Sequence, residues 1–150
     1  MKIFVKLIVV LICILSSFNV NAQNKNSINK VDSVKKIVLE YFNEIPDELD
    51  GCLCYFSKSK SEFIKNHYLL INDFSNIAFL KINGVLTRFE LEKFDEANNV
   101  FYYINPNYKM KIQITKTDTD STDEVDLYGV ILIETENMKN ETSFFGKCIC

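Results

Sequence analysis

Two Cys-x-Cys pairs are the residues whose type and spacing most clearly indicate chemistry. Cys52 and Cys54 stand near the start of the chain's β-rich part, and Cys148 and Cys150 stand at its end. These are four of the five cysteines, and the fifth, Cys13, lies in an N-terminal segment that is typical of an export signal, as described below. An even number of cysteines in an exported chain favours disulfides. Residues i and i+2 of a strand share a face, so each pair presents two sulfurs side by side. Antiparallel neighbours would join Cys52 to Cys150 and Cys54 to Cys148, whereas parallel neighbours would join Cys52 to Cys148 and Cys54 to Cys150.

Three other uses of the cysteines compete with this pattern. Structural zinc sites space their ligands Cys-x₂₋₄-Cys, so a single intervening residue makes a poor chelate. A redox protein would instead close a small strained ring within each pair, and strained disulfides are readily reduced. Intermolecular pairing is the last alternative. We predict disulfides between the two pairs, across neighbouring strands, each closing a loop of nearly a hundred residues.

An acidic loop is the second cluster of candidate ligands. Its carboxylates are the kind of group that binds Ca²⁺, but the EF-hand loop needs glycine at its sixth position and glutamate at its twelfth. Counted from Asp118, those positions hold Asp123 and Gly129, so the pattern fails. We therefore expect a solvated hairpin loop and no metal or cofactor, with Asp118, Asp120 and Asp123 as weak metal candidates only.

No other residues form an enzyme signature. His67 is the only histidine, and its spacing identifies no serine or cysteine partner, so a structural role is expected. The sequence contains no glycine-rich phosphate loop, and its tyrosines on expected strands fit a core or rim role. "NET" at Asn140 is a glycosylation sequon, which matters only in a eukaryotic secretory host. No catalytic residue is predicted, and enzyme activity stays an open question.

The elements that position the cysteines are mostly strands. Hydrophobic alternation and turn residues predict a succession of strands without helical crossovers, so the sheet should be antiparallel. Asn83–Gly84, between two such strands, is the strongest hairpin signal, since a type I′ turn needs positive φ at both positions. The expected strands cover residues 52–57, 67–72, 77–83, 85–94, 100–104, 108–115, 125–134 and 142–150.

One amphipathic helix is expected before these strands. Apolar residues recur at spacings of three and four, and Pro46 would end the helix. The stripe comprises Ile28, Val31, Val34, Val38, Tyr41, Phe42 and Ile45. The predicted fold class is therefore α+β: an N-terminal amphipathic helix packed on an antiparallel sheet or small barrel of seven to eight strands.

The N-terminal residues predict export. Lys2 and Lys6, the apolar run Leu7–Leu15 and a small residue at Ala22 describe a secretory signal peptide over residues 1–22. Cys13 would leave with it, and residues 23–150 would form a single domain, periplasmic or extracellular, without a membrane span. Loss of the two lysines leaves 15 basic against 20 acidic residues, a net charge of −5. That charge, without a basic cluster, argues against a nucleic-acid partner.

Three stretches together carry a resemblance: "DGCLCYFSKSKSEF", "AFLKINGVL" and the terminal "GKCIC". The chain resembles small exported bacterial proteins of unassigned function that share a Gly-Cys-x-Cys-Tyr-Phe stretch, a Lys-Ile-Asn-Gly hairpin and a terminal Cys-x-Cys. In size, export and β content it also looks like the periplasmic lysozyme inhibitors, without their inhibitory loop motif. The expected function is a non-enzymatic envelope or secreted binding or inhibitor protein, with an unknown protein or envelope ligand as partner. The alternative is a thiol-redox protein using a Cys-x-Cys pair.

Overall fold

The computed structural model describes residues 36–119 and 125–149. The described chain is almost entirely strand, with one short helix, α2 (Lys60–Ile64), and one 3₁₀ turn at Glu96–Asn98. Its nine strands are β1 (Leu39–Glu40), β2 (Leu53–Ser57), β3 (Leu70–Asn72), β4 (Ile77–Ile82), β5 (Val85–Asp95), β6 (Val100–Asn105), β7 (Tyr108–Thr119), β8 (Val125–Glu134) and β9 (Lys139–Ile149).

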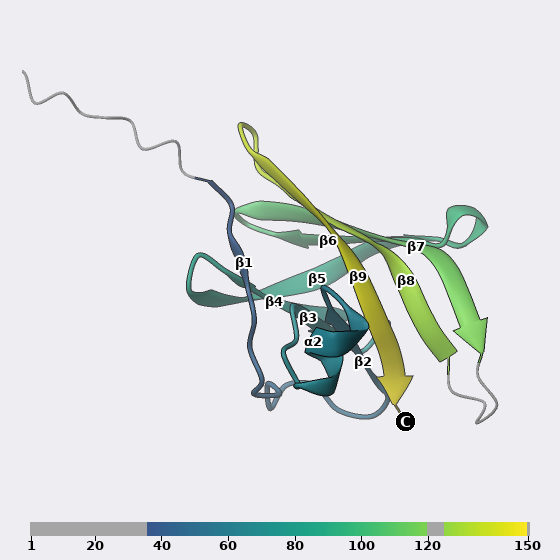
Figure 1. The fold of residues 1–150 in the computed structure, drawn as a ribbon. Coiled ribbons are helices and arrows are strands. Elements are labelled where there is room, and N and C mark those ends of the chain that lie inside the picture. The colour runs from purple at the N-terminus through teal and green to yellow at the C-terminus, as the bar shows by residue number, and fades with distance from the viewer. Residues whose placement is uncertain (1–35, 120–124, 150) are drawn as a thin grey trace, which may run out of the picture. The chain divides into compact units, whose positions relative to one another are not determined.

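Strands β2 to β9 form a closed antiparallel barrel of eight strands (Figure 1). Each strand pairs with the next one along the chain, and β9 returns to pair with β2 over five residue pairs, from Leu53 opposite Ile149 to Ser57 opposite Phe145. The β2–β9 ladder is thus the seam that closes the barrel. The prediction that the strand beginning near Cys52 neighbours the C-terminal strand is confirmed.

The predicted α+β fold class is wrong: the chain forms a mostly-β barrel, and within the described residues no amphipathic helix packs on it. Part of the predicted helix, residues 28–35, lies outside the described residues, and the rest is extended. Strand β1 pairs with the edge of β4 beyond the end of β3, and Phe42 bridges to Tyr68. Burial there has a period of two: Ile37 is 1% exposed and Val38 is 44% exposed. The edge of β4 provides backbone hydrogen-bond partners for an extended segment. In that conformation the side chains of Ile37 and Leu39 pack into the core.

The predicted hairpin at Asn83–Gly84 is confirmed. Asn83 has φ 49° and Gly84 has φ 83°, as a two-residue turn with both central residues left-handed requires. A β-bulge lies on β7 opposite Gly129 and Tyr128 of β8, where the register shifts between Ile114 and Lys116. Gly129 itself is a close-packing position, because a Cβ there would lie 2.0 Å from the Gln113 carbonyl oxygen.

The barrel interior is filled by side chains. An eight-stranded barrel is just wide enough for side chains to fill it or for one small ligand to bind inside. Here the inward positions carry large side chains that are at most 1% exposed, among them Phe56, Leu70, Leu80, Phe89, Tyr103, Met110, Ile112 and Ile131. Asn72 is the polar exception: its Nδ2 donates to the Tyr103 hydroxyl oxygen at 3.2 Å. The interior therefore serves as the hydrophobic core of the fold.

The predicted signal peptide, residues 1–22, and the start of the predicted domain at Gln23 lie outside the described residues. Within the residues described, no helix has the length and apolar character needed to cross a membrane.

Candidate binding pocket on the outer face of the barrel

The closing seam carries a disulfide between Cys54 on β2 and Cys148 on β9. These two residues are direct partners in the antiparallel register, so the bond joins the two Cys-x-Cys pairs rather than closing a ring within either one. It is the connectivity expected for antiparallel neighbours, and it links positions 94 residues apart in the sequence. Cys54 is buried in the core, whereas Cys148 is exposed at the end of the seam.

Cys52 is also disulfide-bonded. The predicted bond between Cys52 and Cys150 involves a residue outside the described part of the chain, so it stays a prediction. The register supports it, because Leu53 pairs with Ile149 and the next position on each strand would bring residues 52 and 150 opposite each other.

The short helix α2 lies over the outer face of this seam, and local sequence explains why it forms. Ser59 is the N-cap: it has extended backbone, and its Oγ accepts a hydrogen bond from the Glu62 N–H. The Ser-x-x-Glu spacing is that of a capping box. Asn66, with φ 58°, turns the chain out of the helix in the left-handed region that asparagine tolerates. The Glu62 carboxylate also accepts from Lys65 Nζ and contacts His67 Nδ1, each at 2.8 Å.

A row of aromatic rings attaches α2 to the barrel. Phe63 packs edge-on against Phe145 of β9 at 5.3 Å and against Tyr68 at 5.7 Å. The row continues from Phe145 to Tyr128 on β8 and from Tyr68 to Tyr55 on β2, with ring centroids 5.5 and 4.9 Å apart. Edge-to-face contacts at these separations are favourable. The helix is therefore fixed to the outside of the barrel through Phe63.

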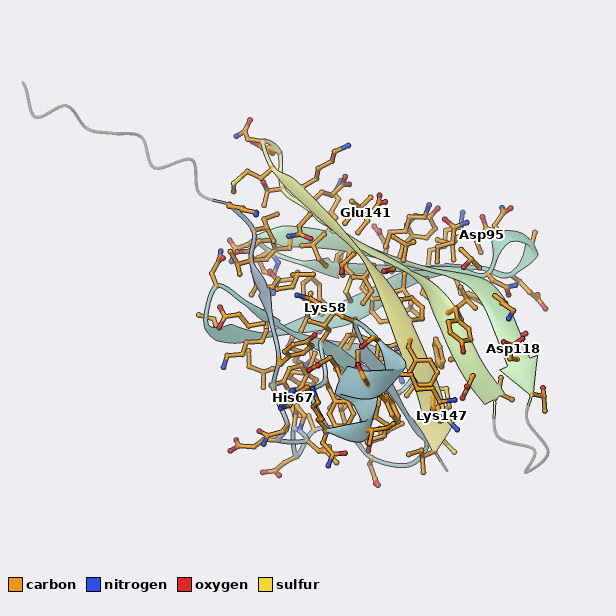
Figure 2. The ribbon with its side chains drawn as sticks, in the orientation of Figure 1. Lys58, His67, Asp95, Asp118, Glu141 and Lys147 are labelled. Atoms are coloured by element: carbon orange, nitrogen blue, oxygen red, sulfur yellow. A yellow bond between two sulfur atoms is a disulfide. The ribbon has the colours of Figure 1, made fainter. Side chains whose placement is uncertain are left out.

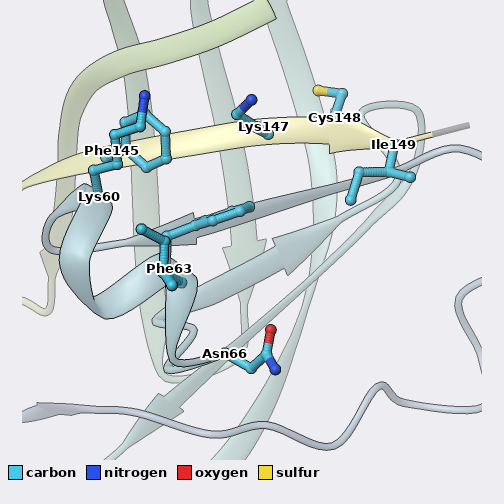
Figure 3. A pocket seen from close by; sticks show the side chains of 8 residues that line it. Lys60, Phe63, Asn66, Phe145, Lys147, Cys148 and Ile149 are labelled. Carbon is cyan, nitrogen blue, oxygen red and sulfur yellow. The ribbon is translucent and has the colours of Figure 1, made fainter. Parts of the chain in front are cut away.

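A pocket of about 590 Å³ opens between α2 and β9 (Figure 3). Its apolar lining comes from Phe63 and Ile64 of the helix and from Phe145 and Ile149 of the strand. Two ammonium groups and one carboxamide complete the described lining: Lys60, Lys147 and Asn66, with Cys148 at the seam. Ile64 is 74% exposed and Ile149 is 57% exposed, so two aliphatic side chains face water here.

A buried carboxylate holds the two lysines in place. Asp126 of β8 is the cross-strand partner of Lys147 and is 7% exposed. Its Oδ2 accepts from Lys60 Nζ at 3.1 Å, and its Oδ1 lies 3.2 Å from Lys147 Nζ. Burial raises the pKa of the Asp126 carboxyl, but the two ammonium groups lower it by more, so the net pKa lies below the usual aspartate range. Asp126 is therefore ionised at neutral pH and orients both lysines.

Of the three metal candidates from the sequence, Asp118 alone lies in the described residues. Asp118 forms an ion pair with Lys116, while Asp120 and Asp123 lie outside the described residues. Within 36–119 and 125–149, no group of three His, Cys, Asp or Glu side chains is placed to hold a metal ion. Figure 2 shows Asp118 on the long hairpin arm, away from Lys58 and His67.

Two other residues considered from the sequence have structural contacts. His67 is stacked on Tyr41, with ring centroids 5.4 Å apart, besides its contact with Glu62. The Asn140 side chain donates to the Ile37 carbonyl oxygen at 2.8 Å and so attaches the N-terminal segment to β9. Glycosylation at Asn140 would replace one of the amide hydrogens and crowd this contact.

Sequence reasoning missed the pocket residues Lys60 and Phe63 and the role of Asp126 beside them. The expected strands leave residues 58–66 without an assigned element, and no contact was predicted for Asp126. The capping-box spacing from Ser59 to Glu62 was the available signal for α2. Nothing in the sequence indicated that Asp126 would be buried between two lysines, because that pairing depends on the register between β8 and β9.

Fold and site together describe a disulfide-stapled, eight-stranded barrel with an amphipathic pocket on its outside. In the comparisons with known proteins, no family model, no curated protein and no solved structure matches the chain. The resemblance to small exported bacterial proteins therefore stays a prediction.

Proposed function

We propose that this chain is an exported, non-enzymatic binding protein and that the pocket between α2 and β9 is its binding surface. The observation that carries the proposal is the exposure of Ile64 and Ile149 beside the ordered ammonium group of Lys60. Ligand pockets combine a mostly apolar lining with a few fixed polar groups, and this pocket has that composition.

Two further features support an exported role. Disulfides persist in oxidising compartments, and the Cys54–Cys148 bond stabilises the seam that closes the barrel. The signal-like pattern of Lys2, Lys6 and the run Leu7–Leu15 fits the same compartments. The redox alternative depended on strained rings within each Cys-x-Cys pair, and Cys54 and Cys148 do not form such rings because they bond to each other.

The proposal is tested by pocket-dependent capture. The purified protein is immobilised and exposed to the envelope and secreted fractions of its source cells, and retained proteins and small molecules are identified by mass spectrometry. Ile64→Glu places a charge in the pocket at an exposed position, so it should fold normally and lose the retained component. Val85→Glu is the matched control, because Val85 is 63% exposed at the distant β4–β5 turn.

A component retained by the unmodified protein and by Val85→Glu, but not by Ile64→Glu, would support the proposal. Failure to retain any component, or equal retention by Ile64→Glu, would overturn it.

A further inference from the structure

We infer that the ligand of this pocket is an amphiphilic monocarboxylate, a small molecule with one carboxylate head and an aliphatic tail. The inference rests on the proposed function, since it names the class of ligand for the same site. In this site the Lys60 ammonium group would bind the carboxylate head, and the exposed aliphatic residues would contact the tail.

Lys60 supplies the contact for the head group. Its Nζ donates to Asp126 Oδ2 at 3.1 Å and lies 5.4 Å from the centre of the Phe145 ring. An ammonium group has three donors, and this carboxylate occupies one of them. The Lys60 side chain is 63% exposed, so its remaining donors reach solvent at the pocket. Figure 3 shows Lys60 beside Phe145 at one end of the pocket.

The charge of the lining selects an anion over a cation. The described lining contains the cations Lys60 and Lys147 and no carboxylate. Asp126, which both ammonium groups contact, is buried, and its charge is compensated by them. A ligand carboxylate would therefore meet ammonium donors first, whereas an ammonium head group would meet like charge.

The apolar side of the pocket selects a tail. Ile64 on α2 and Ile149 on β9 are exposed aliphatic side chains that line the pocket together with the rings of Phe63 and Phe145. Covering such surfaces with an alkyl chain removes apolar area from water, which is favourable and roughly proportional to that area. Asn66 is the only uncharged hydrogen-bonding side chain among the described lining residues, which suits an alkyl tail better than a sugar.

The size of the pocket favours a small molecule over a protein partner. Its volume of about 590 Å³ lies within the range of about 300–1,000 Å³ that is typical of small-molecule sites. A protein partner would instead bury a flat surface of many side chains. The pocket volume therefore favours a small-molecule ligand, and a ten-carbon tail is chosen for the probes.

The test uses three probes that share one tail: n-decanoate, 1-decanol and decyltrimethylammonium, each below its aggregation concentration. Binding to the full chain is followed by chemical-shift perturbation of backbone amides in α2 and β9. We expect n-decanoate to bind most tightly. Lys60→Gln should weaken n-decanoate binding by about tenfold and leave 1-decanol binding unchanged, because only the charged contact is removed.

Two further variants separate the head contact from general effects. Lys139→Gln removes an exposed charge at the start of the same strand, outside the pocket, and should leave all three affinities unchanged. Ile64→Asn should weaken n-decanoate and 1-decanol alike, because both share the tail.

Equal affinity for n-decanoate and 1-decanol, or n-decanoate binding that is insensitive to Lys60→Gln, would overturn the inference. So would tightest binding of decyltrimethylammonium. If none of the probes binds while a captured component still depends on Ile64, the ligand class is wrong and the proposed function stands. If neither probe binding nor Ile64-dependent capture is observed, both fail.

Discussion

Two neighbouring residues of β9 face opposite environments. Phe144 points into the barrel, where it packs edge-on against Phe56 with ring centroids 4.8 Å apart. Phe145 points outward, where it contacts Phe63 of α2 and lines the pocket. One strand therefore contributes both to a filled core and to a surface that is only partly covered.

Under the proposed function, the comparison between the filled interior and the outer pocket favours the pocket as the binding site. The interior is packed with side chains that stabilise the fold, so a ligand there would have to displace core contacts. The outer pocket already exposes apolar side chains to water, and covering them costs no core packing. Substitutions inside the barrel should consequently change stability, and substitutions in the pocket should change binding.

The largest effect on the free energy of unfolding is expected from the cysteines of the β2–β9 seam, which borders both the barrel interior and the outer pocket. Replacing Cys52, Cys54, Cys148 and Cys150 by serine should lower the free energy of unfolding by about 4–5 kcal/mol, because a loop of nearly a hundred residues is no longer closed. Replacing only Cys54 and Cys148 should cost much less if a Cys52–Cys150 bond still closes almost the same loop. Denaturant titrations under non-reducing conditions measure both values. An equal loss in the double and the quadruple variant would show that Cys52 does not bond to Cys150.

A matched pair of phenylalanines tests the comparison directly. Phe56 is fully buried in the barrel, so Phe56→Ala should lower the free energy of unfolding by about 3–5 kcal/mol. Phe63 is only partly buried on α2, so Phe63→Ala should cost about 1 kcal/mol or less, while reducing ligand capture. Chemical denaturation and the capture assay provide the two measurements. If the two variants were equally destabilised, the pocket would be part of the core and the distinction between the regions would be lost.

Much of the barrel could be predicted from sequence because local signals and the chain order agree. All eight barrel strands were expected near their observed positions, and alternation with short turns implied antiparallel pairing. The segment around Leu39 shows the limit of this reasoning. Its apolar residues fit spacings of three and four, yet Ile37 and Leu39, which that stripe omits, are the buried ones. The edge of β4 beyond the end of β3 decides the outcome, and no local spacing in this segment indicates that edge.

The pocket was less predictable than the disulfide for a related reason. Cysteine spacing within a strand restricts the possible bridges, so the seam could be anticipated from the two Cys-x-Cys pairs. The pocket needs a five-residue helix, the β8–β9 register and the burial of Asp126 at the same time. Only the helix has a signal at a fixed spacing, from Ser59 to Glu62, and the register and the burial of Asp126 have none.

A smaller effect than that of the cysteines or of Phe56 is expected from the carboxylate that contacts Lys60 and Lys147. Asp126→Asn removes the anion that orients Lys60 and Lys147, and it should lower the free energy of unfolding at pH 7 by about 1–2 kcal/mol. The pKa of Asp126 is lower in the folded protein than its ordinary value. Its stabilising contribution is therefore fully present above the unfolded-state pKa of about 3.9 and is lost as the pH falls through the lower folded-state value. The stability difference between the unmodified protein and Asp126→Asn should be constant from about pH 5 to 7 and should shrink below about pH 4. Urea denaturation at a series of pH values measures it, with Asp118→Asn on the exposed arm as the control. A difference that persists undiminished in acid would mean that the charge of Asp126 is not what holds the lysines, and that the pocket is ordered by its aromatic contacts instead.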